Sequence, residues 1–389
     1  MDLYVFGFNG HGQLDPSKAN ILLPTKTLSG ATISIHWTSW SDALITTRPT
    51  NSPRNPPPEI VYTGTGLNTN QLTQLTQLTH FFSRPPTKFF TSDLSDSLRG
   101  TLSPPTRKVT FFTSDQTPTP KAPISDIIPF KPNSNIEHIS TTGGGTTYIT
   151  LLPLSNFAFG RTYITHFHSL WDFRTWLRDA VPGPVSTHQI PSCTQLVSNA
   201  TTTTALTGDG QVYTWTADPR YPRCLGRVAD ASEPPGNPHV VPYLSETKVR
   251  KVTAGGYMTA AISEDGELFL WGQACPGTDG ELEVLRMNMG DEDEDDYVKC
   301  VPIYIDGREA RVKDVAIGSG HIIVAAEVEL DGVCSRAVFA AGQGESGQLG
   351  MGIKLNFTEA FERIEGLDGR EVMDLAAAGW SSWVLLKRE

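Results

Sequence analysis

Two patterns in the 389-residue chain could carry chemistry, a glycine-rich turn and a pair of histidines. Gly342, Gly344 and Gly347 have the spacing of a dinucleotide-binding turn, in which a following helix presents free backbone amides to the phosphates. The residues after Gly347 are Gln-Leu-Gly-Met-Gly, which do not favour a helix. The pattern is therefore better explained as the turn of an internal repeat than as a nucleotide site.

The histidine pair is the second pattern. His166 and His168 are two residues apart, so a strand would place both imidazoles on one face, where they could bind a metal ion. No third ligand can be identified, and no serine-hydrolase, zinc-protease or phosphate-loop motif is found. The five cysteines are at least 25 residues apart and form no Cys-x-x-Cys pair. We therefore predict no catalytic residue, no cofactor and no metal site, and expect that the protein is not an enzyme.

Composition restricts the partners and the compartment. The chain has 31 Lys and Arg against 42 Asp and Glu, a net charge of −11, which excludes a broad basic surface for nucleic acid or anionic lipid. With 35 Gly, 28 Pro and only 19% charged residues, turns should be frequent and long helices few. No apolar stretch is long enough for a membrane span, and the N-terminus does not resemble a secretory leader. We expect a cytoplasmic protein, with a nuclear location as the alternative, that contacts neither nucleic acid nor membrane directly.

A recurring phrase predicts the fold. Its clearest copy is a strand at 252–262, an acidic turn at 264–266 and a second strand at 268–272 that ends in Trp-Gly. Three copies keep sixteen positions between the opening small residue and the closing aromatic, at 143–159, 199–215 and 255–271. All the repeats together are centred near 37, 91, 143, 199, 255, 318 and 378. Seven such units predict an all-β, seven-bladed β-propeller that occupies residues 1–389 as one domain.

The two ends of the chain complement each other. The last repeat, near 378, needs a closing aromatic-Gly strand sixteen residues later, beyond the final residue 389. The N-terminus opens with such a strand, Leu-Tyr-Val-Phe-Gly, without a repeat before it. We therefore expect residues 1–10 to pair beside 372–387 and to close the ring.

Irregular stretches interrupt the repeats. Residues 48–59, 101–123 and 277–300 are expected to be loops, and the last contains the acidic run 291–296. That run lacks the residue spacing of a calcium-binding loop, which leaves a solvated loop or a contact with a basic partner. Residues 168–181 have helical apolar spacing and predict one short inserted helix, which either docks a partner or packs on its own propeller.

Aromatic residues at the repeat bends are candidate partner-binding residues. Side chains at the bends can gather on one face of the ring, and rigid aromatics are preferred anchors of protein interfaces. Packing between neighbouring blades is the alternative role. The candidates are Trp37, Trp40, Tyr257, Trp380 and, at its own bend, His321.

Two glycine phrases, Gly7–Leu14 and Gly342–Gly350, carry a family resemblance. With the bend, acidic-Gly and aromatic-Gly elements, they resemble the regulator-of-chromosome-condensation repeat, which forms a seven-bladed propeller. The family's bend histidine is present only as His321. The C-terminal part, with the long turn around Cys334 and the phrase Gly379–Leu386, is most similar to the fungal alpha-tubulin-suppressor proteins, also known for killer-toxin insensitivity.

This second resemblance implies a function. It implies a non-enzymatic adaptor that forms a heterodimer with a small zinc-ribbon electron carrier. The pair would serve diphthamide synthesis and the Elongator-dependent modification of tRNA wobble uridines, with Elongator as a further partner. Other members of the repeat family imply two alternatives, a guanine-nucleotide exchange factor for a Ran-like GTPase and a chromatin-associated partner of an oxygenase. The net charge of −11 and the absence of a basic tail count against the exchange factor.

Overall fold

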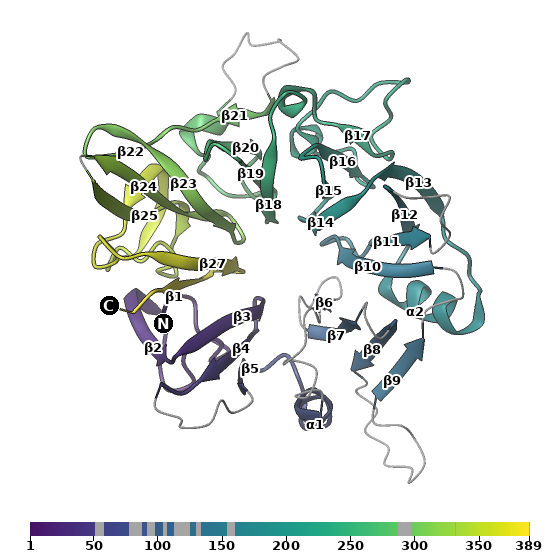
Figure 1. The fold of residues 1–389 in the computed structure, drawn as a ribbon, viewed down its shortest axis with the longest axis horizontal. Coiled ribbons are helices and arrows are strands. Elements are labelled where there is room, and N and C mark those ends of the chain that lie inside the picture. Colours follow the sequence, from purple (N-terminus) through teal and green to yellow (C-terminus); the bar gives the residue numbers. More distant parts are fainter. Residues whose placement is uncertain are drawn as a thin grey trace.

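The computed structural model describes residues 1–50, 58–77, 88–91, 98–103, 107–112, 125–129, 134–153, 160–286, 297–330 and 332–388. These residues form seven antiparallel sheets that stand as blades around a central axis (Figure 1). The predicted seven-bladed propeller is confirmed.

The strands of each blade are given in sheet order from the central axis outward, except that in blade 6 the short β22 precedes the innermost strand β23. Blade 1 contains β3 (Thr32–Thr38), β4 (Asp42–Arg48) and β5 (Glu59–Gly64). Blade 2 contains β6 (Lys88–Thr91), β7 (Leu98–Ser103), β8 (Lys108–Phe112) and β9 (Ser125–Pro129). Blade 3 contains β10 (Ser134–Thr141), β11 (Thr147–Pro153), β12 (Arg161–Phe167) and β13 (Ser186–Pro191). Blade 4 contains β14 (Cys193–Ser198), β15 (Thr202–Thr207), β16 (Val212–Thr216) and β17 (His239–Val240).

The remaining blades include the two ends of the chain. Blade 5 contains β18 (Val249–Gly255), β19 (Met258–Ser263), β20 (Leu268–Gly272) and β21 (Lys299–Cys300). Blade 6 contains β22 (Ile303–Ile305), β23 (Arg308–Ile317), β24 (His321–Leu330), β25 (Val333–Gly344) and β26 (Leu355–Arg363). The closing blade contains β27 (Val372–Ala378), β28 (Ser381–Leu386), β1 (Asp2–Gly7) and β2 (Ile21–Ser29). In the described ranges, three short 3-10 helices span Pro222–Leu225, Pro242–Leu244 and Glu283–Leu285.

The closing blade joins the two ends as predicted. β1 lies between β28 and β2, and its register runs from Asp2 opposite Leu386 to Gly7 opposite Ser381. Leu3 and Phe6 from the N-terminus and Trp383 from the C-terminus share one buried apolar cluster. The two ends therefore stabilise a sheet that neither could complete alone.

The second strand of each of three blades shows why the sequence folds this way. β15, β19 and β28 are buried along all six residues, because neighbouring blades cover both faces of each sheet. Between blades 4 and 5, for example, Val212, Phe269 and Trp271 belong to one buried cluster. The core is thus a series of apolar layers between consecutive blades.

The predicted inserted helix is present as α2 (Leu170–Asp179). The Ser169 hydroxyl caps it by accepting a hydrogen bond from the Asp172 amide at 3.1 Å. Phe173 and Leu177 are buried in the cluster between blades 2 and 3, so the helix packs on its own propeller. Trp171, on its outer side, is 64% exposed.

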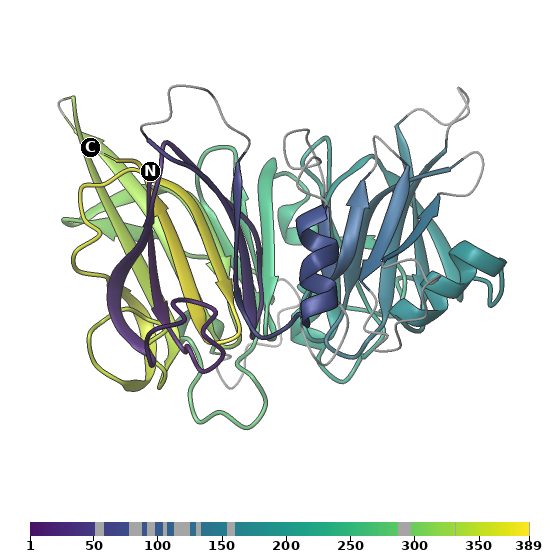
Figure 2. The same cartoon turned by 90° about the horizontal axis from the view of Figure 1, so that it is seen from below.

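A second helix, α1 (Thr69–Gln77), was not predicted. It follows β5 and stands beside blade 2 (Figures 1 and 2). Leu75 is fully buried, and Leu72 packs against the same apolar cluster between blades 1 and 2. The leucines of α1 are separated by polar Thr and Gln residues, so the sequence shows no clear helical apolar pattern. Their role becomes evident only from the structure, where they fill the space between blades 1 and 2.

The loop predictions need correction. The stretch 101–123 contains the end of β7 and all of β8, because Val109 and Phe111 bury their side chains between blades 2 and 3. The stretch 277–300 includes the 3-10 helix at Glu283–Leu285 and β21. Arg48 and Glu59, the ends of the first expected loop, belong to β4 and β5. The acidic run 291–296 lies outside the described residues.

Candidate protein-docking face

We call one side of the propeller the bend face, because the innermost strand of a blade, such as β3 or β23, turns there into the next strand. Described turns on this face are at 39–41, 142–146, 199–201, 256–257, 318–320 and 379–380. Both chain termini lie at the opposite side, near the top of Figure 2. β1 runs from Asp2 toward the closing-blade bend, and its antiparallel partner β28 runs away from that bend, so Asp2 and Leu386 lie opposite each other at the far side. The predicted repeat centres therefore mark one face of the molecule.

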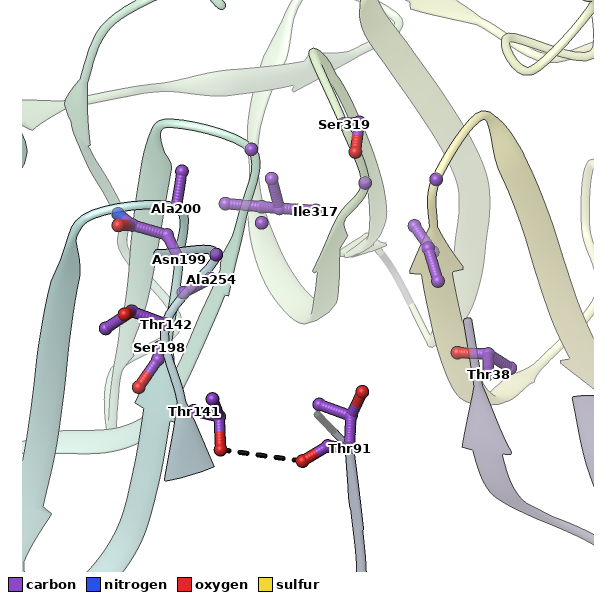
Figure 3. Close-up of a pocket in the computed structure, with 17 residues that line it drawn as sticks. Thr38, Thr91, Thr141, Thr142, Ser198, Asn199, Ala200, Ala254, Ile317 and Ser319 are labelled. Atoms are coloured by element: carbon purple, nitrogen blue, oxygen red, sulfur yellow. Dashed lines mark hydrogen bonds between the residues drawn. The ribbon is translucent and has the colours of Figure 1, made fainter. Parts of the chain in front are cut away.

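At the centre of the propeller, the bends enclose a pocket of about 380 Å³ to which all seven blades contribute (Figure 3). Its lining is uncharged and includes Thr38, Thr91, Thr141, Ser198, Asn199 and Ser319. Backbone hydrogen bonds tie consecutive blades at the rim, from Ala200 N to Gly256 O at 2.8 Å and from Ser319 N to Gly379 O at 2.7 Å. The pocket wall thus provides hydroxyl and backbone groups but no titratable side chain.

The most distinctive feature of the bend face is an aromatic cluster between the closing blade and blade 1. Phe8 stacks on Trp40 with 5.2 Å between ring centroids, and Trp40 meets Trp380 edge-on at 4.6 Å. Phe8 and Trp380 are nearly perpendicular at 6.1 Å, and His11 lies at the edge of Phe8. All four side chains are half-buried. We call Phe8, His11, Trp40 and Trp380 the aromatic cluster.

A buried glutamine holds the three segments of this cluster together. Gln13 is fully buried, and its Nε2 donates to the carbonyls of Phe8 at 2.9 Å and Trp40 at 3.2 Å. The same atom lies 3.2 Å from the Ser381 hydroxyl, next to Trp380. The Phe8 amide also donates to the Trp380 carbonyl at 2.7 Å. The aromatic rings are therefore carried on a backbone that is fixed before any partner arrives.

A glycine makes the closest approach possible. Gly379 has a φ of +54°, and a Cβ there would lie 2.5 Å from Cε3 of Trp40. Any larger residue would push Trp40 away from Trp380. The glycine of the phrase Gly379–Leu386 thus has a packing role at this seam.

The five predicted partner-binding residues lie at different places in the structure. It brings Trp40 and Trp380 together and adds Phe8, which the sequence reasoning missed although it directly follows the strand that closes the ring. Trp37 instead packs in the apolar cluster between blades 1 and 2. Tyr257 lies on the bend face at the seam of blades 4 and 5, where it meets Tyr221 at 4.9 Å.

His321 is not on the surface. It is fully buried, its Nε2 lies 3.0 Å from the Ser382 hydroxyl, and burial lowers the pKa of its imidazole to about 3. A Cβ on Gly318 would overlap the His321 ring, so this bend closes over the side chain. The expectation that His321 faces a partner is therefore corrected: it is a neutral core residue between blade 6 and the closing blade.

The remaining titratable candidates are not assembled for chemistry. Burial, and then the neighbouring Tyr221, raises the pKa of Tyr257, so its hydroxyl stays neutral. His166 stacks on Tyr148 at 5.0 Å and lies 6.0 Å from His168 between ring centroids. In the described part of the chain, no three His, Cys, Asp or Glu side chains are grouped so that they could hold a metal ion. Neither described helix is long and apolar enough to span a membrane.

The comparisons with known proteins agree with this architecture. No family model matches the chain. Over 153 residues, 38% of this chain, the sequence is 32% identical to the Mus musculus protein Regulator of chromosome condensation, of which 30% is covered. Over 155 residues, also 38% of this chain, it is 28% identical to the Homo sapiens E3 ubiquitin-protein ligase HERC2, of which 3% is covered. The matched region thus spans less than a third of either relative.

A solved structure resembles the whole chain. Prp20p from Saccharomyces cerevisiae has a TM-score of 0.57 at 14% identity, and the match covers 100% of this chain and 92% of that one. The chain shares the β-propeller fold of that structure. The matched relatives carry different names, a chromosome-condensation regulator and a ubiquitin-protein ligase, so the similarity by itself defines no single activity.

Proposed function

We propose that this propeller is a non-enzymatic adaptor that binds a partner protein on its bend face at the aromatic cluster. The observation that carries the proposal is the set of three half-buried rings, Phe8, Trp40 and Trp380, fixed by one buried glutamine. Rigid aromatic side chains give large contact areas at low entropic cost and dominate the binding energy of many interfaces. The uncharged rim of the central pocket continues the same face.

We further propose that the partner is a small zinc-ribbon electron carrier, bound as a heterodimer. Support comes from the resemblance of the C-terminal phrase to the fungal alpha-tubulin-suppressor proteins, because this phrase contributes Trp380 to the aromatic cluster and Gly379 to the backbone packed against Trp40. The resulting complex would serve diphthamide synthesis and the Elongator-dependent modification of tRNA, in the cytoplasm or also in the nucleus. Elongator would then be a second, larger partner.

Co-expression with the zinc-ribbon protein of the same organism, followed by size exclusion with light scattering, tests this proposal. We expect a stable one-to-one complex. Trp380→Ala should reduce co-elution if the aromatic cluster is the interface, whereas Tyr257→Ala should do so if the seam of blades 4 and 5 is used. Absence of any complex with the intact chain would contradict the zinc-ribbon partner.

A second candidate function is guanine-nucleotide exchange on a Ran-like GTPase. It is favoured by the 32% identity to the mouse Regulator of chromosome condensation and by the similarity to Prp20p, whose structure was reported with its binding to Gsp1p and histones. Release of labelled GDP from a Ran-like GTPase, measured with and without the purified chain, tests it. Acceleration of release would rank exchange above the adaptor role, and an unchanged rate would remove it.

A further inference from the structure

Blade 1 differs from the other six blades at its outer edge. In those six blades the third strand pairs on its outer side with one more strand, as β1 with β2, β8 with β9, β12 with β13, β16 with β17, β20 with β21 and β25 with β26. Within the described residues, β5 pairs with β4 only. The part of the chain that the structure describes therefore places no further strand at the outer edge of β5.

The hydrogen-bond pattern shows which groups point outward. The Thr65 amide donates to the Ser41 carbonyl at 3.0 Å, just beyond the register of β5 with β4. Because the bonding direction alternates along an antiparallel strand, Thr63 and Val61 bond inward to β4. Ile60, Tyr62 and Gly64 then direct their amides and carbonyls away from the blade, and these groups have no backbone partner among the described residues.

The other blades show how such an edge is used. In blade 5, the Leu268 carbonyl accepts a hydrogen bond from the Val301 amide at 2.8 Å, and in blade 6 the Val338 carbonyl accepts one from Ile364 at 2.8 Å. Each carbonyl lies five residues before the amide that bonds back to the bend, that of Gln273 or Gln343. Five residues before Thr65 is Ile60. The Ile60 carbonyl is therefore the equivalent acceptor in blade 1.

Helix α1 does not fill this role. Its Leu72 and Leu75 supply the apolar contacts between blades 1 and 2, next to the side chains of Ile60 and Tyr62. A helix satisfies its backbone groups internally and cannot pair with a strand edge. Helix α1 thus provides the apolar packing of an outer strand in blade 1, whereas none of the described segments provides the backbone hydrogen bonds of such a strand.

We propose that the outer edge of β5 binds an extended segment of a partner protein, which adds to blade 1 as an antiparallel fourth strand. The donors in blades 5 and 6 indicate the chemistry of this occupant: an extended segment that has backbone amides, and not prolines, at the positions facing the carbonyls of Ile60 and Tyr62. The outer edge of β5 is continuous with the aromatic cluster. The Thr63 hydroxyl donates to the Gln13 carbonyl at 2.7 Å, and Oγ1 of Thr65 lies 3.1 Å from Nδ1 of His11. This inference goes beyond the proposed function and does not depend on which protein binds the aromatic cluster.

Amide hydrogen exchange of the full chain tests the proposal in two steps. In the free chain, the Ile60, Tyr62 and Gly64 amides should exchange about tenfold faster than those of Val61 and Thr63. A synthetic peptide of residues 355–364, the sequence of the chain's own outer strand β26, serves as the probe. At about 1 mM peptide, the exchange of the three outward amides should slow by about tenfold.

The matched control is the same peptide with Glu362→Pro and Ile364→Pro, which removes two of its amide donors. Slowing by the native peptide and not by the proline peptide supports strand addition. Three results would overturn it: outward amides already protected in the monomeric free chain, protection that arises only as the chain dimerises, or equal effects of both peptides. None of these results involves the zinc-ribbon protein, so they leave the proposed function to its own experiment.

Discussion

Replacing Gln13 with alanine should loosen the aromatic cluster and destabilise the propeller by a predictable amount. Gln13 is fully buried, and the two Nε2 hydrogens are shared by the Phe8 carbonyl, the Trp40 carbonyl and the Ser381 hydroxyl. Its Oε1 accepts from the His11 amide at 3.1 Å. The two Nε2 hydrogens and the Oε1 contact together provide three hydrogen-bond equivalents over these four contacts. At about 1 kcal/mol for each equivalent, Gln13→Ala should lower the free energy of unfolding by about 3 kcal/mol.

Urea denaturation followed by far-ultraviolet circular dichroism measures this loss, with the slope of the transition checked against the parent chain. Gln348→Ala is the matched control, because Gln348 follows β25 in blade 6 and is equally buried, but its hydrogen bonds join Ser346 and Ser382 and not the carbonyls of Phe8 and Trp40. Both variants should be less stable, and only Gln13→Ala should also weaken partner binding. A loss below about 1 kcal/mol for Gln13→Ala, with unchanged binding, would refute the reasoning.

Three further changes have defined outcomes. Gly379→Ala should lower the free energy of unfolding in urea by about 1 to 2 kcal/mol, because its Cβ would overlap Trp40 at a positive φ; an unchanged value would contradict this contact. Burial lowers the pKa of His321 to about 3, so protonation of this side chain favours the unfolded chain, and the free energy of unfolding should fall as pH drops from about 6.5 toward 3. His321→Gln should reduce this pH dependence in urea unfolding series. The same pH dependence in the variant and the parent chain would contradict the role of His321. Burial and the neighbouring Asp314 raise the pKa of Asp374 to about 6, so the free energy of unfolding should fall as pH rises from 3.8 to about 6. Asp374→Asn should raise the free energy of unfolding by about 1 to 2 kcal/mol above that pH range and leave it unchanged below the range. A gain in stability that is independent of pH would exclude the carboxylate as the cause.

The architecture was readable from the sequence because each blade repeats a local phrase. The spacing from a small bend residue to a closing aromatic fixes two adjacent strands, and the N-terminal strand that lacks a repeat of its own implies the shared closing blade. The confirmed pairing of β1 with β28 rests on that reasoning. Helix α1 was not predicted, because the contacts of its leucines with the apolar cluster between blades 1 and 2 depend on the arrangement of these blades.

The candidate site was only partly readable. Residues at the bends were expected on one face, yet Trp37 turns into the wedge between two blades and His321 into the core. The sequence pattern predicts that a residue lies near a bend, but it does not predict whether the side chain points to the surface or between two blades. The glycine phrase Gly7–Leu14 contains Phe8 and Gln13 but predicts no role for them. The contacts that reveal the role of Gln13 join it to Trp40 and to Ser381, 27 and 368 positions away in the chain.

The most direct test of the proposed docking face is the affinity of the purified chain for the zinc-ribbon protein, measured by isothermal titration calorimetry. The double variant Trp40→Ala and Trp380→Ala should weaken binding by about a hundredfold or more, as expected when about 3 kcal/mol of anchor energy is lost. Trp171→Ala is the control, because Trp171 is the more exposed tryptophan and lies on α2, outside the aromatic cluster. Binding that falls only in the double variant is the predicted result, and equal affinities for all three chains would contradict the aromatic cluster as the docking site.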